Sequence, residues 1–256
     1  MRLILTFSLQ SGSNGNAIYV EADGVRLLFD AGISGRRATQ RMLTHDRRMH
    51  DVDALIISHD HADHIQYAGV FQRLFGPPIY MTQATHNACR HDLGRLVDVR
   101  YFESGDRLVF GGVTVHTIRT PHDAADGVAF VVECAEKRLG ILTDLGCVFD
   151  GLDEIVGSLD AAYMESNYDP QMLARGSYPP ELKQRIRGSG GHISNEESAD
   201  VIERCIAERL QWVALAHLSD INNTPELALE THRQRYGDRI RVRLAPRYEA
   251  SALLEV

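Results

Sequence analysis

The sequence predicts an α/β fold in which two mixed β-sheets pack face to face and helices cover their outer surfaces. Three observations lead to this expectation. Short apolar or alternating segments, typical of strands, fill much of the chain. Segments with apolar residues at helical spacing lie among them, and turn residues separate the elements. Two strand-rich halves, each with helices to cover one face, favour a layered architecture.

The expected elements follow one another along 256 residues. Strands are predicted at Leu3–Leu9, Asn16–Ala22, Val25–Phe29, Ala54–Ile57, Arg107–Phe110, Val113–Ile118, Val128–Cys134, Leu139–Leu142, Ala161–Met164 and Trp212–Ala216. Helices are predicted at Ser34–Arg48, His64–Phe75, Gln83–Leu93, Pro180–Arg187, Glu196–Arg209 and from Thr224 onward. A layered α/β domain often reaches this length undivided, so we expect residues 1–256 to form a single domain.

Composition restricts the classes of function. The chain has 27 Lys and Arg against 35 Asp and Glu, a formal charge of -8. An acidic surface opposes nonspecific attraction to phosphate backbones, so nucleic-acid binding would depend on local basic patches or metal ions. No segment approaches the roughly 20 apolar residues that span a bilayer, so we expect no membrane contact.

The N-terminal segment and the cysteines indicate a cytoplasmic protein. The apolar run Met1–Phe7 is short and passes into the polar loop Ser11–Asn16 without a cleavage-like site, which is typical of a first strand rather than a signal peptide. The four cysteines lack CxxC spacing, as expected of reduced thiols; they are Cys89, Cys134, Cys147 and Cys205.

The strongest chemical signal is the segment Ser58–His64, which reads SHDHADH and directly follows a buried strand. Three imidazoles and two carboxylates are crowded into one turn, more than a single ion would use. These ligand types suit Zn²⁺, Mn²⁺ or Fe²⁺, and the lack of cysteine favours a catalytic over a structural site. A lone histidine would more often be a surface residue, but three at this spacing predict a metal centre.

The HxHxDH pattern after an apolar strand resembles the signature of the metallo-β-lactamase fold, and further motifs follow in the expected order over nearly the whole chain. The resemblance implies an αββα sandwich with two divalent metal ions. It implies that the first ion is held by His59, His61 and His122, that the second is held by Asp63, His64 and His217, and that Asp144 bridges them. Alone, His122, Asp144 and His217 would be a loop, a turn and a core residue. Their common position at predicted strand ends favours ligation.

Four blocks resemble the YycJ/WalJ-like exonuclease subgroup of this fold: Ser11–Asn16, Glu165–Asp169, Tyr178–Ile186 and Gly191–Asn195. The subgroup pattern has His where this chain has Tyr168 and Leu where it has Ile193, so no role is carried over to the side chain at 168. The loop Ser11–Asn16 lacks the Lys-Ser/Thr of a P-loop and is expected to border the metal site. The resemblance implies a two-metal phosphodiesterase that is a 5′-to-3′ exonuclease, with DNA rather than RNA as its nucleic-acid substrate.

The expected mechanism uses a metal-bridging hydroxide. Asp63 would orient the hydroxide, and His192 would stabilise the scissile phosphate or protonate the leaving oxygen. The expected substrate contacts are Asn167, Lys183, Arg185 and Asn195. The region before Gly188 is locally basic, which suits phosphate binding, although a solvated helix face explains each cation equally well.

Other readings remain open in the sequence. A thioesterase of the glyoxalase II kind would use the same ligands, and a diiron oxygen-binding protein or a metal-bound scaffold would keep many of them. Intact His61 and His64 favour hydrolysis. The ligands accept Zn²⁺, Mn²⁺ or Fe ions alike, and neither the metal nor the oligomeric state is defined by the sequence. Six further histidines match no ligand spacing and are assigned to the surface or to packing: His45, His50, His86, His91, His116 and His232.

Overall fold

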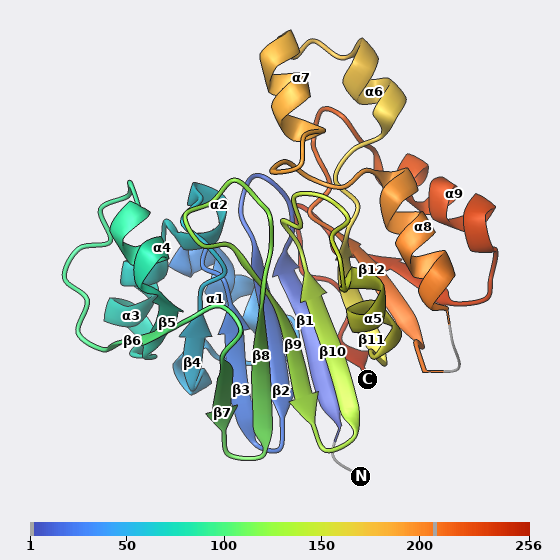
Figure 1. Cartoon of the computed structure of the whole chain (residues 1–256). Coiled ribbons are helices and arrows are strands. Elements are labelled where there is room, and N and C mark those ends of the chain that lie inside the picture. Colours follow the sequence, from blue (N-terminus) through green and yellow to red (C-terminus); the bar gives the residue numbers. More distant parts are fainter. Residues whose placement is uncertain (1–2, 207–208) are drawn as a thin grey trace.

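The computed structural model describes residues 3–206 and 209–256, and it consists of two packed sheets with helices on the outside (Figure 1). The first sheet has the strand order β14-β1-β2-β3-β4-β5-β6. Its strands are β1 (Ile4–Gln10), β2 (Ala17–Ala22), β3 (Val25–Phe29), β4 (Ala54–Ile56), β5 (Ile79–Thr82), β6 (Val99–Phe102) and β14 (Leu254–Glu255). Strands β3 to β6 run parallel, whereas β1, β2 and β14 pair antiparallel.

The second sheet has the order β13-β12-β11-β10-β9-β8-β7. Its strands are β7 (Arg107–Phe110), β8 (Val113–Arg119), β9 (Val128–Cys134), β10 (Lys137–Leu142), β11 (Ala161–Glu165), β12 (Trp212–Ala216) and β13 (Arg241–Leu244). Strands β10 to β13 run parallel, and β7 to β10 form an antiparallel meander. Each sheet is therefore mixed, as the sequence predicted.

Helices complete a four-layer sandwich. They are α1 (Gly35–Leu43), η1 (Met49–Asp51), α2 (Ala62–Ile65), α3 (Ala68–Phe75), α4 (Gln83–Ala88), α5 (Leu152–Gly157), α6 (Pro170–Arg175), α7 (Pro180–Ile186), α8 (Asn195–Cys205) and α9 (Pro225–Tyr236). Helices α1 and α3 pack on the first sheet, and α5, α8 and α9 pack on the second. Helices α6 and α7 project beyond the strand ends at the top of Figure 1. No helix in the described ranges combines the length and apolarity needed to cross a membrane.

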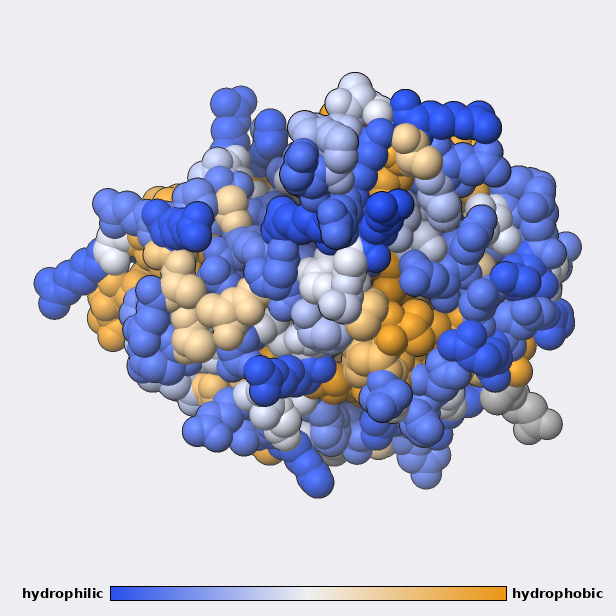
Figure 2. All heavy atoms as spheres, turned by 45° about the horizontal axis from the view of Figure 1, so that its top comes forward, coloured by the Kyte–Doolittle hydropathy of each residue, from blue (hydrophilic) through white to orange (hydrophobic). Residues whose placement is uncertain are grey.

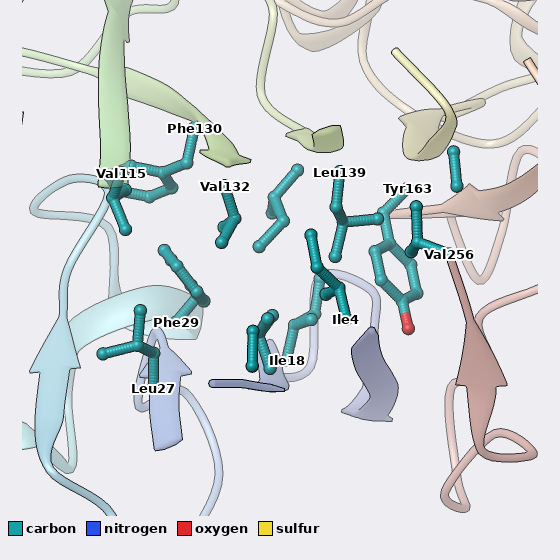
Figure 3. Close-up of a cluster of buried hydrophobic side chains, with 14 of the residues drawn as sticks. Ile4, Ile18, Leu27, Phe29, Val115, Phe130, Val132, Leu139, Tyr163 and Val256 are labelled. Carbon is teal, nitrogen blue, oxygen red and sulfur yellow. The ribbon is translucent and has the colours of Figure 1, made fainter. Parts of the chain in front are cut away.

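The core between the sheets is built from inward-facing residues of both (Figure 3). Phe29 of β3 and Phe130 of β9 meet across the interface with ring centroids 5.1 Å apart. Both are almost fully buried. Aromatic pairs of this kind add to the stabilisation from apolar burial, so this contact helps to lock one sheet on the other.

The predicted strands are confirmed, with small changes at their ends, but several elements differ from expectation. Short elements that the sequence analysis missed are β5, β6, β13, β14, α5 and α6. The helix predicted at 64–75 is two helices, because the N–H of Tyr67 donates to Ala31 O instead of continuing one helical ladder.

Three predicted helices are shorter in the structure. The helix predicted at 34–48 is shortened to α1, with the short η1 following it at 49–51, and the helix at 83–93 ends at Ala88. The helix at 196–209 begins one residue earlier and ends at Cys205. Residues 207 and 208 of that prediction lie outside the described residues. The capping box of Ser194 with Glu197 and the N-cap Thr224 are present.

The parallel arrangement brings several strand ends to one edge of the sandwich. Strands β3, β4, β10, β11 and β12 all finish there, and β8 runs in the same direction as β10. In sheets with parallel strands, ligands commonly bind beyond the carboxyl ends. A functional site is therefore expected at this edge of the sandwich.

We predict that Phe130→Ala lowers the free energy of unfolding by about 3–5 kcal/mol, because it leaves a cavity between the sheets. Urea denaturation followed by circular dichroism, with a chelator present so that metal binding does not contribute, measures this change. Val109→Ala is the control, since Val109 is 68% exposed and should change stability by less than about 0.5 kcal/mol. Equal losses in the two variants would contradict the role of the Phe29 contact.

Candidate metal centre

The structure brings the predicted metal ligands together at this edge. Each follows a strand or lies in the first turn of the short helix α2. His59 follows β4, His61 is the N-cap of α2, Asp63 and His64 lie within α2, His122 follows β8, Asp144 follows β10 and His217 follows β12. Residues separated by more than 150 positions in the chain thus form one cluster.

Three of these histidines form one group. The side-chain nitrogens of His59, His61 and His122 lie within 4.8 Å of one another. His61 Nδ1 and His122 Nε2 are 3.2 Å apart, and the rings meet edge to face. Three imidazoles converging on one point are a suitable ligand set for a borderline divalent ion.

A second group lies beside the first and contains Asp63, His64 and His217. Asp63 Oδ2 is 3.3 Å from His217 Nε2 and 3.5 Å from His64 Nε2. Asp144 contacts both groups: its Oδ1 lies 3.6 Å from His122 Nε2 and 3.6 Å from His217 Nε2, and its Oδ2 lies 3.2 Å from His64 Nε2. The Asp144 carboxylate is therefore placed between the two groups.

Hydrogen bonds behind the rings fix their orientation. His64 Nδ1 is 2.7 Å from Asp30 Oδ2, and Ser58 Oγ donates to the same oxygen over 3.0 Å. Ser58 Oγ is also 2.9 Å from His59 Nδ1, and His122 Nδ1 donates to Gly191 O over 2.7 Å. Such partners turn the Nε2 atoms toward the centre and set the tautomer, which is how metal-ligating histidines are usually supported.

One atom of the cluster tests directly whether a metal fits. His59 Nε2 is buried and has no hydrogen-bond partner. A buried polar nitrogen without a partner is costly, so the site as folded requires something at this position. Burial, reinforced by His64, holds the pKa of His59 well below its ordinary value, so the ring is neutral, the form that binds a metal. The donor set fits a divalent ion.

The buried carboxylate of Asp144 is ionised, and positive charge beside it stabilises that form. Burial disfavours the charged form of Asp144, but His217 and His64 outweigh it and hold the pKa of Asp144 well below its usual range. Burial likewise disfavours the imidazolium of His217, but Asp144 and hydrogen bonds to Asp63 and Glu165 raise the pKa of His217 to about 10. The histidines thus supply the compensating charge that metal ions would otherwise provide.

Backbone strain marks the same place. Asp30, Asp144 and His217 have φ of 65°, 57° and 54°, in the left-handed region that residues other than glycine rarely adopt. All three directly follow the ends of their strands or nearly so, and all three reach the centre. Strain that accumulates at one cluster indicates that the fold holds these side chains there at some energetic expense.

The sequence analysis missed Glu165 and Asp30 as members of the site. Glu165 is fully buried; its Oε1 lies 2.7 Å from His192 Nδ1, and its Oε2 accepts the N–H of Leu145. Burial disfavours its charged form, but His192 holds the pKa of Glu165 at about 2. Asp144, Glu165, His192 and His217 also form a group of side chains close enough to share an ion. Each missed carboxylate ends a strand, and this shared position was the available signal.

The loop after β1 lies against the centre, as expected from the sequence. Asn16 Nδ2 is 3.0 Å from His64 Nε2 and 3.3 Å from Asp63 Oδ2. The Asn16 N–H donates to Asp63 O over 2.7 Å, and Gly32 N–H donates to Asn16 O. The loop therefore supports α2, the helix that carries Asp63 and His64.

The predicted substrate contacts are placed differently from one another. Asn167 and Asn195 are buried, and their amides bond within the protein: Asn167 to His217, and Asn195 to Ser166 and Asn223. They support the loops around the centre, and neither side chain is exposed to a substrate, contrary to expectation. The reason is that a motif does not show whether a polar side chain faces inward.

The two cations lie on α7. Lys183 Nζ donates to Ala174 O at the end of α6 and so joins the two projecting helices. Arg185 is exposed and forms an ion pair with Asp123 through both carboxylate oxygens. Asp123 Oδ1 in turn lies 3.8 Å from His61 Nε2, which places Arg185 at the rim of the centre. Tyr168 is buried, and its backbone forms an isolated parallel β-bridge with Ser194. Burial raises the pKa of the Tyr168 hydroxyl to about 12.

A four-layer αββα sandwich with a histidine and aspartate cluster at the strand ends defines a metal-dependent hydrolase. The family model for the beta-lactamase superfamily domain matches residues 25–213. The chain belongs to this superfamily, and the fold predicted from its sequence is confirmed.

Curated relatives and a solved structure are similar over most of the chain. Exodeoxyribonuclease YycJ of Bacillus anthracis is 36% identical over 222 residues, which cover 86% of this chain and 84% of the relative. Exodeoxyribonuclease WalJ of Streptococcus pneumoniae is 37% identical over 224 residues, covering 86% and 83%. The metallo-beta-lactamase fold protein YhfI from Bacillus subtilis superposes with a TM-score of 0.74 at 16% identity, covering 99% of this chain and 100% of that one. The structural likeness shows the shared fold.

We predict that Gly32→Ala disrupts the centre, because a Cβ at residue 32 would lie 1.7 Å from Asp63 O and 2.6 Å from Asn16 N. The expected result is a loss of bound metal per folded chain, measured by elemental analysis after dialysis, with circular dichroism to confirm folding. Gly157→Ala is the matched control, since a Cβ there meets no atom within 4 Å. Full metal content in Gly32→Ala would show that α2 is not positioned by this contact.

Proposed function

We propose that the protein is a two-metal phosphodiesterase that degrades DNA from the 5′ end. The observation that carries the proposal is the pair of ligand groups joined by Asp144. The exodeoxyribonuclease names of relatives that align over more than four fifths of both chains support the nuclease class and DNA over RNA.

In this proposal His59, His61 and His122 would hold one divalent ion, Asp63, His64 and His217 would hold the other, and Asp144 would contact both. Zn²⁺, Mn²⁺ or Fe ions would supply water activation at neutral pH and stabilise charge on a phosphoryl group. The ligand set itself contains only two carboxylates, so two divalent ions would leave positive charge there and favour an anionic substrate.

Asp63 and His192 have distinct roles. The Asp63 carboxylate, held by Asn16 and His217, can accept a hydrogen bond from the nucleophile and orient it. His192 Nδ1 faces the ionised Glu165, so Nδ1 carries a proton and the ring orientation is fixed. Its side chain is 19% exposed and its ring lies near both His122 and His217. A proton on His192 Nε2 could therefore pass to the leaving oxygen and be replaced from solvent, while the Nδ1 proton stays with Glu165.

We predict that the purified protein with Mn²⁺ or Zn²⁺ releases labelled mononucleotide directly from 5′-labelled DNA, whereas 3′-labelled DNA shortens progressively. RNA of the same sequence should be degraded more slowly. Asp63→Asn should reduce the rate by at least about hundredfold. Asp60→Asn is the matched control, because Asp60 lies on the same loop but accepts a hydrogen bond from the Ala125 N–H rather than facing the ligand groups.

Two results would contradict the proposal. Release of mononucleotide first from the 3′ label would overturn the polarity. Absence of phosphodiester cleavage with every metal, together with release of thiol from a glutathione thioester, would identify a thioesterase instead.

A second prediction separates proton donation from metal binding. His192→Ala should lower kcat on DNA by about 10²- to 10⁴-fold, because the leaving sugar oxygen needs a proton. The loss should be much smaller on a p-nitrophenyl phosphodiester, whose leaving group is stable as an anion. His116→Ala, on β8 and paired with Glu133, is the control. Equal losses on both substrates would refute the donor role, and reduced metal content would show His192 to be a ligand.

A further inference from the structure

A cavity of about 550 Å³ lies beside the metal centre, between the segments that follow β12 and β13. Its lining includes Leu218, Asp220, Pro225, Leu244, Pro246 and Tyr248. Ser11 also lines it, and Ser11 Oγ accepts the N–H of His217 over 2.8 Å. The cavity therefore begins one residue away from a predicted metal ligand, on the edge of the sandwich where the centre lies.

The walls of the cavity suit a flat, apolar ring. Tyr248 is 68% exposed, yet its orientation is fixed at two points. Its hydroxyl donates to Asp220 Oδ1 over 3.0 Å, and its carbonyl accepts from Arg41 of α1 over 2.6 Å. Leu218 and Leu244 supply aliphatic surface. An exposed aromatic ring held in place beside aliphatic walls is a stacking surface.

The charges of the cavity distinguish a base from a phosphate. Its lining carries three carboxylates, Asp220, Glu226 and Glu249, against one arginine, so it disfavours phosphate. Asp220 Oδ1 accepts from the Tyr248 hydroxyl and lies 3.4 Å from Arg247 Nε, whereas Glu226 and Glu249 can accept hydrogen bonds from exocyclic amines. Arg247 is the one cation among the described residues that line the cavity. Its side chain is only 12% exposed, pairs with Asp220 over 3.4 Å, and donates to Leu218 O and to Asn14 Oδ1 over 3.1 Å. It is thus committed within the protein rather than available to an anion.

Cations are found outside the cavity instead. Arg36 and Arg37 are exposed near the start of α1. Arg41 lies near Arg37, but its guanidinium is bonded to Gln10 Oε1 and Tyr248 O. The molecular face seen when the top of Figure 1 is turned forward is mostly hydrophilic, with apolar residues showing between (Figure 2). The arrangement of an apolar, acid-lined cavity with arginines beyond it matches a nucleotide, whose base is neutral and whose phosphates are anionic.

We propose that this cavity binds the base of the nucleotide adjoining the scissile phosphate and that the base stacks on Tyr248. The proposal rests on the proposed function. The volume falls in the usual range for small-molecule sites. Two lining residues adjoin the predicted ligand His217, because Ser11 accepts its N–H and Leu218 follows it in the chain, so the cavity lies next to the centre. Stacking does not depend on the identity of the base, as a nuclease without sequence preference requires.

Binding of 2-aminopurine deoxyribonucleoside 5′-monophosphate, followed by its fluorescence, tests the cavity with the metal-loaded protein and without catalysis. Tyr248→Ala should raise Kd by about tenfold, whereas Tyr248→Phe, which keeps the ring, should remain near the wild type. Tyr101→Ala is the matched control, since Tyr101 is a half-exposed tyrosine of β6. Equal Kd values in Tyr248→Ala and the wild type would overturn the proposal.

A kinetic comparison gives a second readout. The p-nitrophenyl esters of deoxyadenosine 5′- and 3′-phosphate carry a base, and methyl p-nitrophenyl phosphate carries none. The wild type should prefer one of the nucleoside esters, and Tyr248→Ala should reduce that preference in kcat/KM by about tenfold through KM. An unchanged preference would count against the cavity. If the wild type cleaves none of these diesters, the proposed function fails and the fluorescence titration alone decides the cavity.

Discussion

The buried carboxylate of Asp144 is the constraint on which the site depends. An ionised group without solvent is stable only beside compensating charge, and the imidazoles of His64 and His217 provide it for Asp144. To bring those imidazoles to one point, the fold ends several strands at the same edge and accepts left-handed backbone at Asp30, Asp144 and His217. The requirement for charge balance therefore connects the sheet topology to the chemistry, because divalent ions could meet the same balance.

The support around the ligands forms a continuous polar network rather than a set of separate contacts. Asp30 accepts hydrogen bonds from Ser58, and both contact His64. Glu165 plays the corresponding part on the other sheet, where it contacts His192 and the N–H of Leu145. Each network rises from the end of a strand buried in the sandwich. The rigid layers thus fix the orientation of the rings, which mobile loops alone could not do.

Part of the fold and of the site could be predicted from the sequence, and the rest could not, for physical reasons. The HxHxDH turn could be predicted as a metal site because its residues are close together in the chain. The layered architecture could be predicted because strands and helices differ in the spacing of their apolar residues. Strands β5 and β6 were not predicted, because segments of four residues show little periodicity and their pairing depends on distant partners. Asp30 and Glu165 were not predicted as site residues, because a carboxylate at a strand end can belong to a turn or to a site until the neighbouring strands are placed. For Asn195 the motif predicted a substrate contact, whereas the burial of its side chain shows a structural role.

The proposed action on DNA would require this acidic protein to obtain its affinity from something other than a basic surface. Two sources are compatible with a formal charge of -8: metal ions that offset the negative charge locally, and stacking of a base on an aromatic ring. Neither attracts duplex DNA at long range, so both favour a nucleotide that has already separated from its neighbours. Bases at a strand end separate most readily, since they stack on one side only. Taken with the cavity beside His217, this physical preference for an unstacked end agrees with exonucleolytic rather than internal cleavage.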